Sequence, residues 1–162
     1  EKITSIVDEA VIKNWSYLRL SPRPKFDRYV SKNIGIINKN RLYRTSTAWA
    51  LFKKDVLIDL LDERESAWDF EIKGSERSNK YDDFYSVDVE ILPYLNGVVK
   101  GKWVNKVYRH LKKENFDVSD KNIKKMNFYE SILFEFIKIR SYFFEYLVPK
   151  SLKLPIRKMF YK

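Results

Sequence analysis

Apolar residues recur at helical spacing near both ends of the sequence. Between residues 2 and 13 they fall on one face of a predicted helix, at Ile3, Ile6, Val7, Ala10 and Val11. The longest such pattern follows Ser119, a candidate N-cap, and extends to Leu147, shortly before Pro149. Packing on the preceding part of the chain is the simplest explanation of its wide apolar surface, and membrane contact is the alternative.

Short apolar runs between these helices predict β-strands. They are residues 15–20 (WSYLRL), residues 45–52 (TSTAWALF) and residues 84–92 (FYSVDVEIL). Two more helices are expected, one carrying Val56, Leu57, Leu60 and Leu61 and one carrying Val107 and Leu111. Residues 25–44 are polar apart from a short apolar patch at residues 34–37. The sequence therefore predicts a mixed α/β domain.

Residues 65–78, ESAWDFEIKGSERS, place two carboxylates close behind a tryptophan. Ser66 is a candidate N-cap of a short helix that ends near Gly74, and Asp69 completes a capping-box spacing. Capping is therefore one explanation of Asp69. Glu71 lies about 200° around the helix from Asp69, so the two carboxylates cannot serve the same cap. Trp68 and Glu71 share a face, which favours a general base beside a stacking platform, although exposed glutamates are common on helices.

Composition narrows the classes of function. The 162 residues suggest one domain, and they carry a net charge of +10 and 16% aromatic residues. The sequence has no cysteine and one histidine, His110. Disulfides and thiolate metal sites are therefore excluded, and a Ser–His catalytic pair could use only His110. The sequence does not begin with methionine, so we expect residues upstream of it.

The last sixteen residues form a basic arm. Residues 147–162 contain five cations and no acid, interleaved with bulky apolar residues: Lys150, Lys153, Arg157, Lys158 and Lys162. That mixture suits an anionic membrane surface. Nucleic acid is not expected as a partner, because no recognisable binding motif accompanies the arm. A solvated basic tail without a partner is the other interpretation.

Three segments together resemble a known family. The succession YRTSTAWALFKKDVLIDLL, ESAWDFEIKGSERS and ILPYLNGVVKGKW is similar to the C-terminal half of bacterial glycosyltransferase-like proteins from surface-polysaccharide loci. The resemblance covers about residues 15–113 and leaves the basic arm outside. It implies a GT-A-like α/β fold around a mostly parallel sheet, with a C-terminal helical, basic arm.

In that family the N-terminal half binds the nucleotide sugar, and an Asp-x-Asp-type motif holds a divalent metal at the diphosphate. This chain begins after the position of that motif. The resemblance therefore implies that a nucleotide-sugar donor and Mn²⁺ or Mg²⁺ are held only through an upstream half. Asp82 and Asp83 lie after the Trp-x-Phe-Glu segment, so they are not expected to replace the motif. No metal site is expected within residues 1–162.

Residue by residue, the resemblance assigns the general base of an inverting transferase to Glu71. Asp69 occupies a variable position, so capping or a supporting charge suits it, and Trp68 would line the acceptor pocket. Arg77 and Lys102 are candidates for the diphosphate or an acidic sugar, with exposed surface cations as the alternative. Ser46 and Trp49 are candidate acceptor contacts, or residues of the core.

We therefore expect residues 1–118 to be the acceptor-side half of a GT-A-like transferase domain, and residues 119–162 to be an amphipathic helix with the basic arm. The expected activity transfers a sugar from a nucleotide donor to a surface-polysaccharide acceptor, at the cytoplasmic face of the cell membrane. The alternative is a non-catalytic basic module that binds a membrane surface or nucleic acid.

Overall fold

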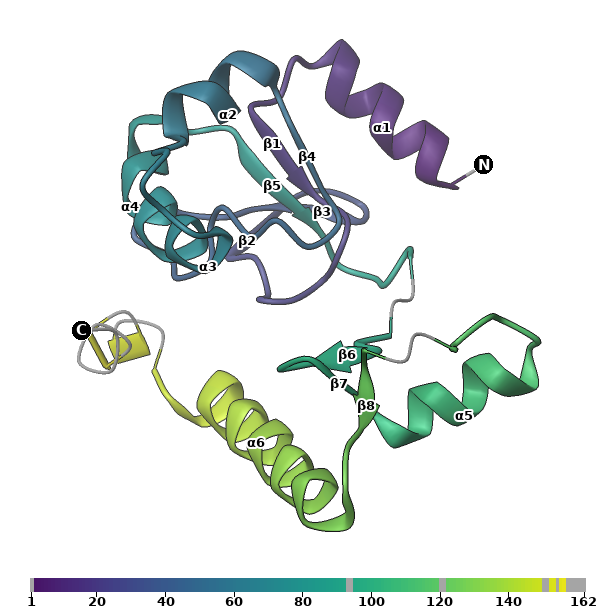
Figure 1. Ribbon diagram of the computed structural model, residues 1–162. Coiled ribbons are helices and arrows are strands. Elements are labelled where there is room, and N and C mark those ends of the chain that lie inside the picture. Colours follow the sequence, from purple (N-terminus) through teal and green to yellow (C-terminus); the bar gives the residue numbers. More distant parts are fainter. Residues whose placement is uncertain (1, 93–94, 120–121, 150–151, 154, 157–162) are drawn as a thin grey trace. The chain divides into compact units, whose positions relative to one another are not determined.

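The computed structural model describes residues 2–92, 95–119, 122–149, 152–153 and 155–156 (Figure 1). The chain divides into two compact units. The sheet unit comprises residues 1–92 and 149–162, and the two-helix unit comprises residues 93–148. Both contain helices and strands, so the mixed α/β class is confirmed. The functional division expected at residue 118 stays a prediction.

Five strands form the centre of the sheet unit. They are β1 (Tyr17–Arg19), β2 (Arg28–Ser31), β3 (Ile34–Ile36), β4 (Ala50–Phe52) and β5 (Phe84–Val87), in the order β2-β3-β5-β1-β4. β1 and β5 pair in parallel, with Tyr17 opposite Phe84. The other three neighbouring pairs are antiparallel. For the strands that the structure describes, the expectation of a mostly parallel sheet is therefore wrong.

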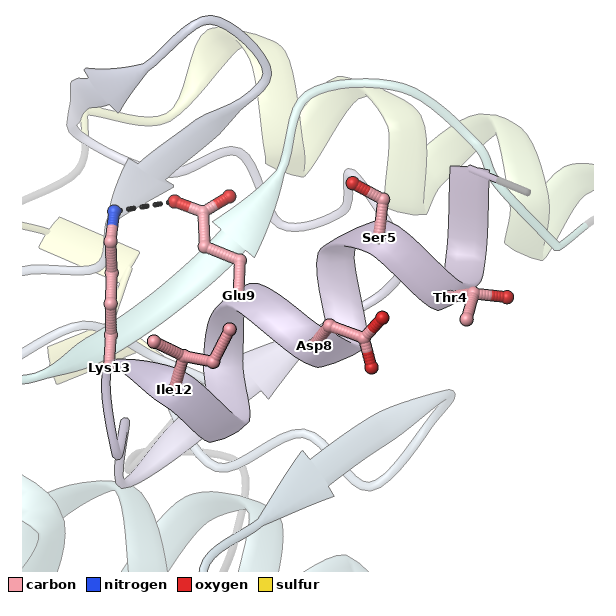
Figure 2. A pocket seen from close by; sticks show the side chains of 6 residues that line it. All are labelled: Thr4, Ser5, Asp8, Glu9, Ile12 and Lys13. Atoms are coloured by element: carbon pink, nitrogen blue, oxygen red, sulfur yellow. Dashed lines mark hydrogen bonds and ion pairs between the residues drawn. The ribbon is translucent and has the colours of Figure 1, made fainter.

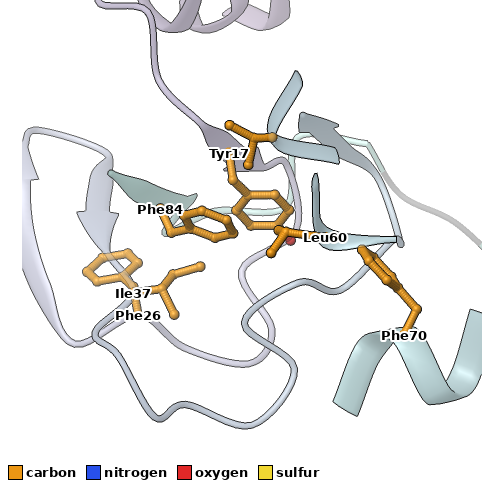
Figure 3. Close-up of a cluster of buried hydrophobic side chains, with 7 residues drawn as sticks. Tyr17, Phe26, Ile37, Leu60, Phe70 and Phe84 are labelled. Carbon is orange, nitrogen blue, oxygen red and sulfur yellow. The ribbon is translucent and has the colours of Figure 1, made fainter. Parts of the chain in front are cut away.

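Helices cover both faces of this sheet. α1 (Lys2–Ile12) contributes Ala10 to a buried cluster that contains Leu18. α2 (Lys54–Leu60) contributes Leu60 to a second cluster, around Tyr17 and Phe84 (Figure 3). Tyr17 and Leu18 are consecutive on β1, so their side chains point to opposite faces of the sheet. Both are at most 1% exposed, and the strand is buried between two helical layers.

Short helical segments connect α2 with β5. α3 (Ala67–Asp69), the π-helical turn η1 (Phe70–Gly74), α4 (Ser75–Arg77) and the 3₁₀ turn η2 (Ser78–Lys80) follow one another directly. The predicted helix end at Gly74 is wrong, because that residue has helical φ and ψ of −60° and −35°. Lack of space explains the glycine. A Cβ atom there would lie 2.9 Å from the ring of Phe70 and 3.2 Å from Oγ1 of Thr45.

The two-helix unit has its own small sheet. β6 (Val98–Val99), β7 (Lys102–Trp103) and β8 (Lys124–Lys125) lie in that order, with β6 antiparallel and β8 parallel to β7. The turn between β6 and β7 has φ of 50° at Lys100 and 71° at Gly101. Two consecutive positive φ values are the geometry of a type I′ turn. Such a turn favours glycine at its second central position.

The helices of this unit are α5 (Asn105–Lys113), which buries Val107, and α6 (Phe128–Leu147). Ser119 is not the N-cap of the last helix. A capping box between Asn127 and Glu130 begins α6, because the preceding segment is held in β8 beside β7. The predicted helix around Val107 and Leu111 is confirmed.

All three predicted strands are shorter than expected, and of residues 15–20 only Tyr17–Arg19 is strand. In residues 45–52 only Ala50–Phe52 is strand, because Thr45 bonds to Ser75 and Phe70 instead of a neighbouring strand and Trp49 turns the chain with a φ of 49°. In residues 84–92 the strand ends at Val87. β2 and β3 lie in the polar region where no element was predicted.

No helix in the described part of the chain has the length and apolar character needed to cross a bilayer. Most of the predicted basic arm lies outside the described residues, namely residues 150–151, 154 and 157–162. Of its described residues, Leu152 is half exposed and Lys153 is buried.

Candidate functional site around Glu71

The helical run that carries Glu71 begins at a capping box. The amide of Asp69 donates to Oγ of Ser66 at 3.2 Å, and the amide and hydroxyl of Ser66 donate to Oδ2 of Asp69 at 3.2 and 2.6 Å. The predicted N-cap is therefore confirmed. These hydrogen bonds from Ser66, helped by the charge of Lys73, hold the pKa of Asp69 below its ordinary value. Capping accounts for the Asp69 carboxylate.

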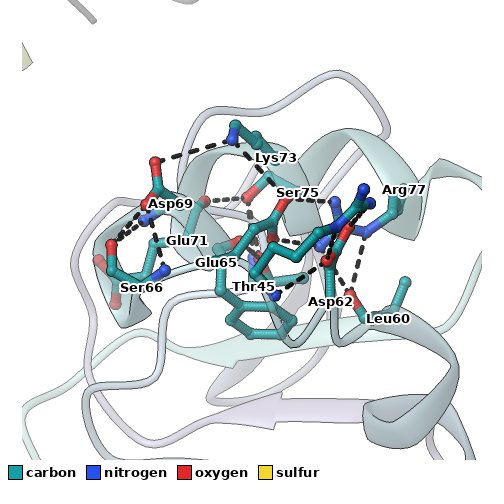
Figure 4. A network of polar contacts seen from close by, with 12 residues as sticks. Thr45, Leu60, Asp62, Glu65, Ser66, Asp69, Glu71, Lys73, Ser75 and Arg77 are labelled. Atoms are coloured by element: carbon teal, nitrogen blue, oxygen red, sulfur yellow. Dashed lines mark hydrogen bonds and ion pairs between the residues drawn. The ribbon is translucent and has the colours of Figure 1, made fainter.

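Glu71 itself lies in the π-helical turn. Such turns are rare, and they are frequent at functional sites. Carbonyl oxygens of this turn bond to side chains: Thr45 Oγ1 donates to the carbonyl of Phe70 at 3.2 Å, and the hydroxyl of Ser75 donates to the carbonyl of Glu71. The amide of Thr45 in turn donates to Oγ of Ser75 at 3.1 Å. The loop at Thr45 and the turn are thus locked together (Figure 4).

Three donors converge on one carboxylate oxygen of Glu71. Oε1 accepts hydrogen bonds from the amide of Thr47 at 2.8 Å, from its hydroxyl at 3.1 Å and from the hydroxyl of Ser46 at 3.1 Å. All the hydrogen bonds that Glu71 accepts through its carboxylate from described residues end on Oε1. The side chain is half-buried. The hydrogen bonds on one oxygen therefore fix the orientation of the carboxylate, and Oε2 accepts no hydrogen bond from the described residues.

The loop that supplies these donors, residues 43–49, is itself held by a buried side chain of β1. Tyr17 donates its phenolic hydroxyl to the carbonyl of Ser46 at 2.7 Å. Burial raises the pKa of Tyr17, against the opposing charge of Arg19, so its hydroxyl keeps its proton. Tyr43 and Trp49 at the two ends of the loop have positive φ values of 58° and 49°. Residues other than glycine rarely adopt this backbone conformation, so the surrounding fold imposes it on the loop.

A fully buried arginine anchors the start of the same loop. Arg44 donates to the carbonyl oxygens of Ile37 at 3.1 Å and Tyr81 at 2.9 Å, and to both oxygens of Ser78. Its guanidinium lies 4.2 Å from the ring centre of Phe84. Burial lowers the pKa of Arg44 to about 10. Arg44 thus joins the loop to the residue that follows β3, to η2 and to β5.

Arg77, a candidate for the diphosphate, is engaged within the sheet unit. Its two terminal nitrogens donate to the two carboxylate oxygens of Glu65 at 2.9 and 2.6 Å, and the guanidinium also donates to the carbonyl of Leu60. The hydrogen bonds to Glu65 raise the pKa of Arg77. The bonds to Leu60 fasten the end of α2 to α4, and the bidentate pair with Glu65 fastens the segment between α2 and α3 to α4 (Figure 4).

The remaining candidates are distributed over the chain. Lys102 belongs to the two-helix unit, where it pairs with Glu130. Trp68 is 71% exposed and Trp49 is 45% exposed, so neither belongs to the core. Of the residues singled out from the sequence, the structure brings Ser46 and Glu71 into direct contact. It holds Asp69 and Arg77 with other partners.

Sequence reasoning missed Thr47, the residue that makes two of the three contacts with Glu71. A signal was available. The run Thr45-Ser46-Thr47 puts three consecutive hydroxyls in a segment predicted as a buried strand, and buried hydroxyls need hydrogen-bond partners. Such a run indicates a loop that bonds to a neighbouring element.

Metal ligands do not gather around this site. In the ranges that the structure describes, no group of three or more His, Cys, Asp or Glu side chains is placed to hold a cation. Asp82 pairs with Lys39 at 2.7 Å, and Asp83 accepts the amide of Ser16 at 2.7 Å. The prediction that residues 1–162 hold no metal site remains to be tested.

A surface hollow of about 660 Å³ lies elsewhere, along α1 (Figure 2). Five of its six lining residues, Thr4, Ser5, Asp8, Glu9 and Ile12, belong to that one helix, and the sixth, Lys13, follows it directly. Glu9 and Lys13 in it are paired with each other at 2.6 Å. Side chains from a single helix do not converge as they do in a ligand pocket, so Glu71 remains the stronger candidate.

Comparison with known proteins gives no further assignment. No protein-family model matches the sequence, and neither a curated protein nor a solved structure is significantly similar to it.

Proposed function

We propose that the chain is the acceptor-side half of an inverting glycosyltransferase, in which Glu71 is the general base. The observation that carries the proposal is the geometry of Glu71: three donors hold Oε1, while Oε2 of the same half-buried carboxylate accepts no hydrogen bond from the described residues. A general base needs a fixed orientation and one accessible oxygen. The family resemblance of residues 65–78 supports the same residue.

In the proposed reaction, the acceptor hydroxyl attacks the anomeric carbon of the donor sugar. Oε2 of Glu71 takes the hydroxyl proton as the new glycosidic bond forms. The bond from the anomeric carbon to the nucleoside diphosphate breaks, and the diphosphate leaves with the electron pair. A single displacement inverts the configuration at that carbon.

The other candidate residues take supporting roles in this proposal. Trp68 and Trp49 expose aromatic rings, which are suited to stacking on an acceptor sugar. Asp69 and Arg77 become scaffold residues, since each is committed to a partner that positions the helix of Glu71. Lys102 pairs with Glu130 in the two-helix unit, and its role toward an acidic sugar or the diphosphate stays a prediction.

The donor side of the reaction is assigned to residues upstream of this chain. There a nucleotide sugar and Mn²⁺ or Mg²⁺ would bind, as the family resemblance implies. The glycan acceptor and the anionic inner surface of the cell membrane are the proposed partners of this chain, the latter through residues 147–162 and their five cations.

The test uses the protein with its upstream residues, a panel of nucleotide sugars, Mn²⁺ and a surface-glycan acceptor, with release of nucleoside diphosphate as the readout. We expect Glu71→Gln to lower turnover by about 10² or more, the usual effect of losing a general base. Asp69→Asn, two residues earlier in the same helical run, is the matched control and is expected to retain most activity. Equal turnover of wild type and Glu71→Gln would remove Glu71 from the mechanism.

One observation favours a second candidate function, a non-catalytic basic module. α5 carries four cations and no acid, Lys106, Arg109, Lys112 and Lys113, and all four are exposed. A basic amphipathic helix of this kind binds anionic surfaces. In that case the contacts of Glu71 only fasten the loop. Binding of anionic vesicles or nucleic acid, together with no transfer from any nucleotide sugar, would favour this function.

A further inference from the structure

α6 carries an apolar seam with the spacing of a coiled coil. Six residues alternate three and four positions apart along the helix: Tyr129, Ile132, Phe136, Ile139, Phe143 and Tyr146. Each of them is between 41% and 73% exposed. A repeat of 3.5 residues keeps one apolar stripe of a helix facing a second helix. The spacing therefore points to a partner helix.

Along the first half of α6, the opposite side contacts other residues of the same unit. The hydroxyl of Ser131 accepts a hydrogen bond from Asn105 at 2.9 Å, and Glu130 pairs with Lys102. Phe134 and Ile137 on this side are partly buried. Consequently the seam faces outward from the two-helix unit.

The size of the exposed surface fits an interface. Four more exposed apolar side chains flank the seam: Phe128, Leu133, Tyr142 and Leu147. At the exposures observed, these ten side chains offer roughly 1,000 Å² of surface, against about 800 Å² per partner in a stable complex. A monomer seldom leaves a patch of this size uncovered.

The flanking positions specify which partner fits. In a parallel pair of identical helices, each residue just before the first seam position of a heptad faces the residue five places later on the other copy. For α6 these pairs are Phe128 with Leu133, Glu135 with Arg140, and Tyr142 with Leu147. Two are apolar with apolar, and the third joins opposite charges. All three pairs are therefore favourable in a parallel arrangement of two copies.

We propose that α6 is the dimerisation element of this protein and pairs in parallel with α6 of a second copy. The interaction is independent of the proposed transferase activity, because it uses no residue of the Glu71 site. A membrane surface fits the helix less well, since Glu135 flanks the apolar seam and an anionic bilayer repels carboxylates.

The first experiment measures the mass of the chain by sedimentation over a wide range of concentration. We expect twice the mass of one chain, and one chain mass for Ile139→Asp. Ser141→Asp is the matched control, because Ser141 is exposed on the side of α6 away from the seam, and it should remain dimeric. Circular dichroism establishes that the variants are folded. A single-chain mass for the unaltered protein at every concentration would overturn the proposal.

The orientation of the two α6 helices is tested by cysteine cross-linking. The chain contains no cysteine, so each introduced cysteine is its only thiol. In a parallel pair the two copies of Tyr129→Cys lie opposite each other and should form an intermolecular disulfide readily. In an antiparallel pair they would be roughly 25 Å apart, too far for a disulfide. Ser141→Cys should cross-link poorly. Equal cross-linking of Tyr129→Cys and Ser141→Cys would contradict the parallel arrangement.

The charge pair gives a third test. Glu135→Arg and Arg140→Glu each place like charges across the dimer, so each variant should self-associate about tenfold more weakly. Mixing the two variants restores opposite charges at both sites and should yield the mixed dimer. If the mixture forms no more mixed dimer than either variant forms homodimer, the proposal fails. It also fails if the unaltered protein sediments with the mass of one chain while Ile139→Asp abolishes its binding to anionic vesicles.

Discussion

The amide of Thr47 donates a 2.8 Å hydrogen bond to the carboxylate of Glu71, 24 residues further along the chain. This contact closes the loop onto the π-helical turn. Glu71 is therefore a structural acceptor of hydrogen bonds as well as a candidate general base. The two roles can be separated, because an amide oxygen can accept a hydrogen bond but cannot take up the proton of an acceptor hydroxyl at neutral pH.

Glu71→Ala should lower the free energy of unfolding by about 1–3 kcal/mol, because the amide of Thr47 and two hydroxyls lose their acceptor. Glu71→Gln should cost about 1 kcal/mol or less, since its amide oxygen can accept the same donors. Urea unfolding measures both. If the two variants are equally unstable, the charge of Glu71 holds the loop, and the loss of activity in Glu71→Gln no longer reports on catalysis alone.

The capping box should be visible in a titration. The pKa of Asp69 is lowered by the hydrogen bonds from Ser66, so the folded state is favoured at pH above the ordinary pKa of an aspartate. That contribution disappears as the pH falls through the lowered pKa. We expect Ser66→Ala to raise the pKa of Asp69 in an NMR titration, whereas Ser66→Thr should keep it low. An unchanged pKa in Ser66→Ala would assign the shift to Lys73.

Arg44→Lys should destabilise the sheet unit by roughly 2–4 kcal/mol. Lysine lacks the planar fork that reaches acceptors on Ile37, Ser78 and Tyr81 together, so buried carbonyl oxygens lose their donors. Thermal unfolding checks the change. Arg64→Lys is the control: its side chain is 83% exposed, and we expect an effect within about 0.5 kcal/mol. A similarly small effect for Arg44→Lys would show that the hydrogen bonds of the Arg44 guanidinium are dispensable for stability.

Gly74→Ala should be destabilising by about 1–3 kcal/mol, although alanine is the better helix former by about 1 kcal/mol. The added methyl would meet Phe70 and Thr45 at 2.9 and 3.2 Å. Lys73→Ala on the exposed side of the same turn should change stability little. Chemical denaturation compares the two variants. A stabilising Gly74→Ala would mean that Phe70 yields easily and that the turn is loosely packed.

The basic arm should attach the protein to anionic vesicles at low salt. Each cation near such a surface contributes roughly 1 kcal/mol, and salt screens the attraction. Sedimentation with vesicles should pellet the whole chain, and a chain that ends at Val148 should stay in the supernatant. Lys153 is buried, so Lys153→Ala should matter less than Lys150→Ala. Identical partitioning of the two chain lengths would remove the arm from membrane binding.

Local features of this protein could be predicted from the sequence. The capping box of Ser66 and Asp69 depends on residues three positions apart, and α1 follows from one apolar stripe. β2 could not be predicted in this way, because its exposed edge position leaves it without an apolar pattern. The start of α6 was placed eight residues too early, at Ser119 rather than Asn127, since Asn127 and Glu130 were not recognised as a cap.

The long-range features could not be predicted. Ser46 and Glu71 were both selected, but no local pattern states that their side chains meet. Arg44 was overlooked because arginines are seldom fully buried, and its acceptors come from two separate segments, at Ile37 and at residues 78–81. The π-helical turn has no reliable signature in one sequence, although it decides where the Glu71 carboxylate points.

The position of β5 in the sheet has a consequence for biosynthesis. In the order β2-β3-β5-β1-β4, this strand lies between the β2–β3 pair and the β1–β4 pair, and it is the last of the five to emerge from a ribosome. Until Phe84–Val87 is available, the chain holds two separate two-stranded ribbons, each of which is marginally stable in water. The sheet unit therefore assembles late and in one step, and a nascent chain that stops before Phe84 has its unpaired edges exposed to other chains.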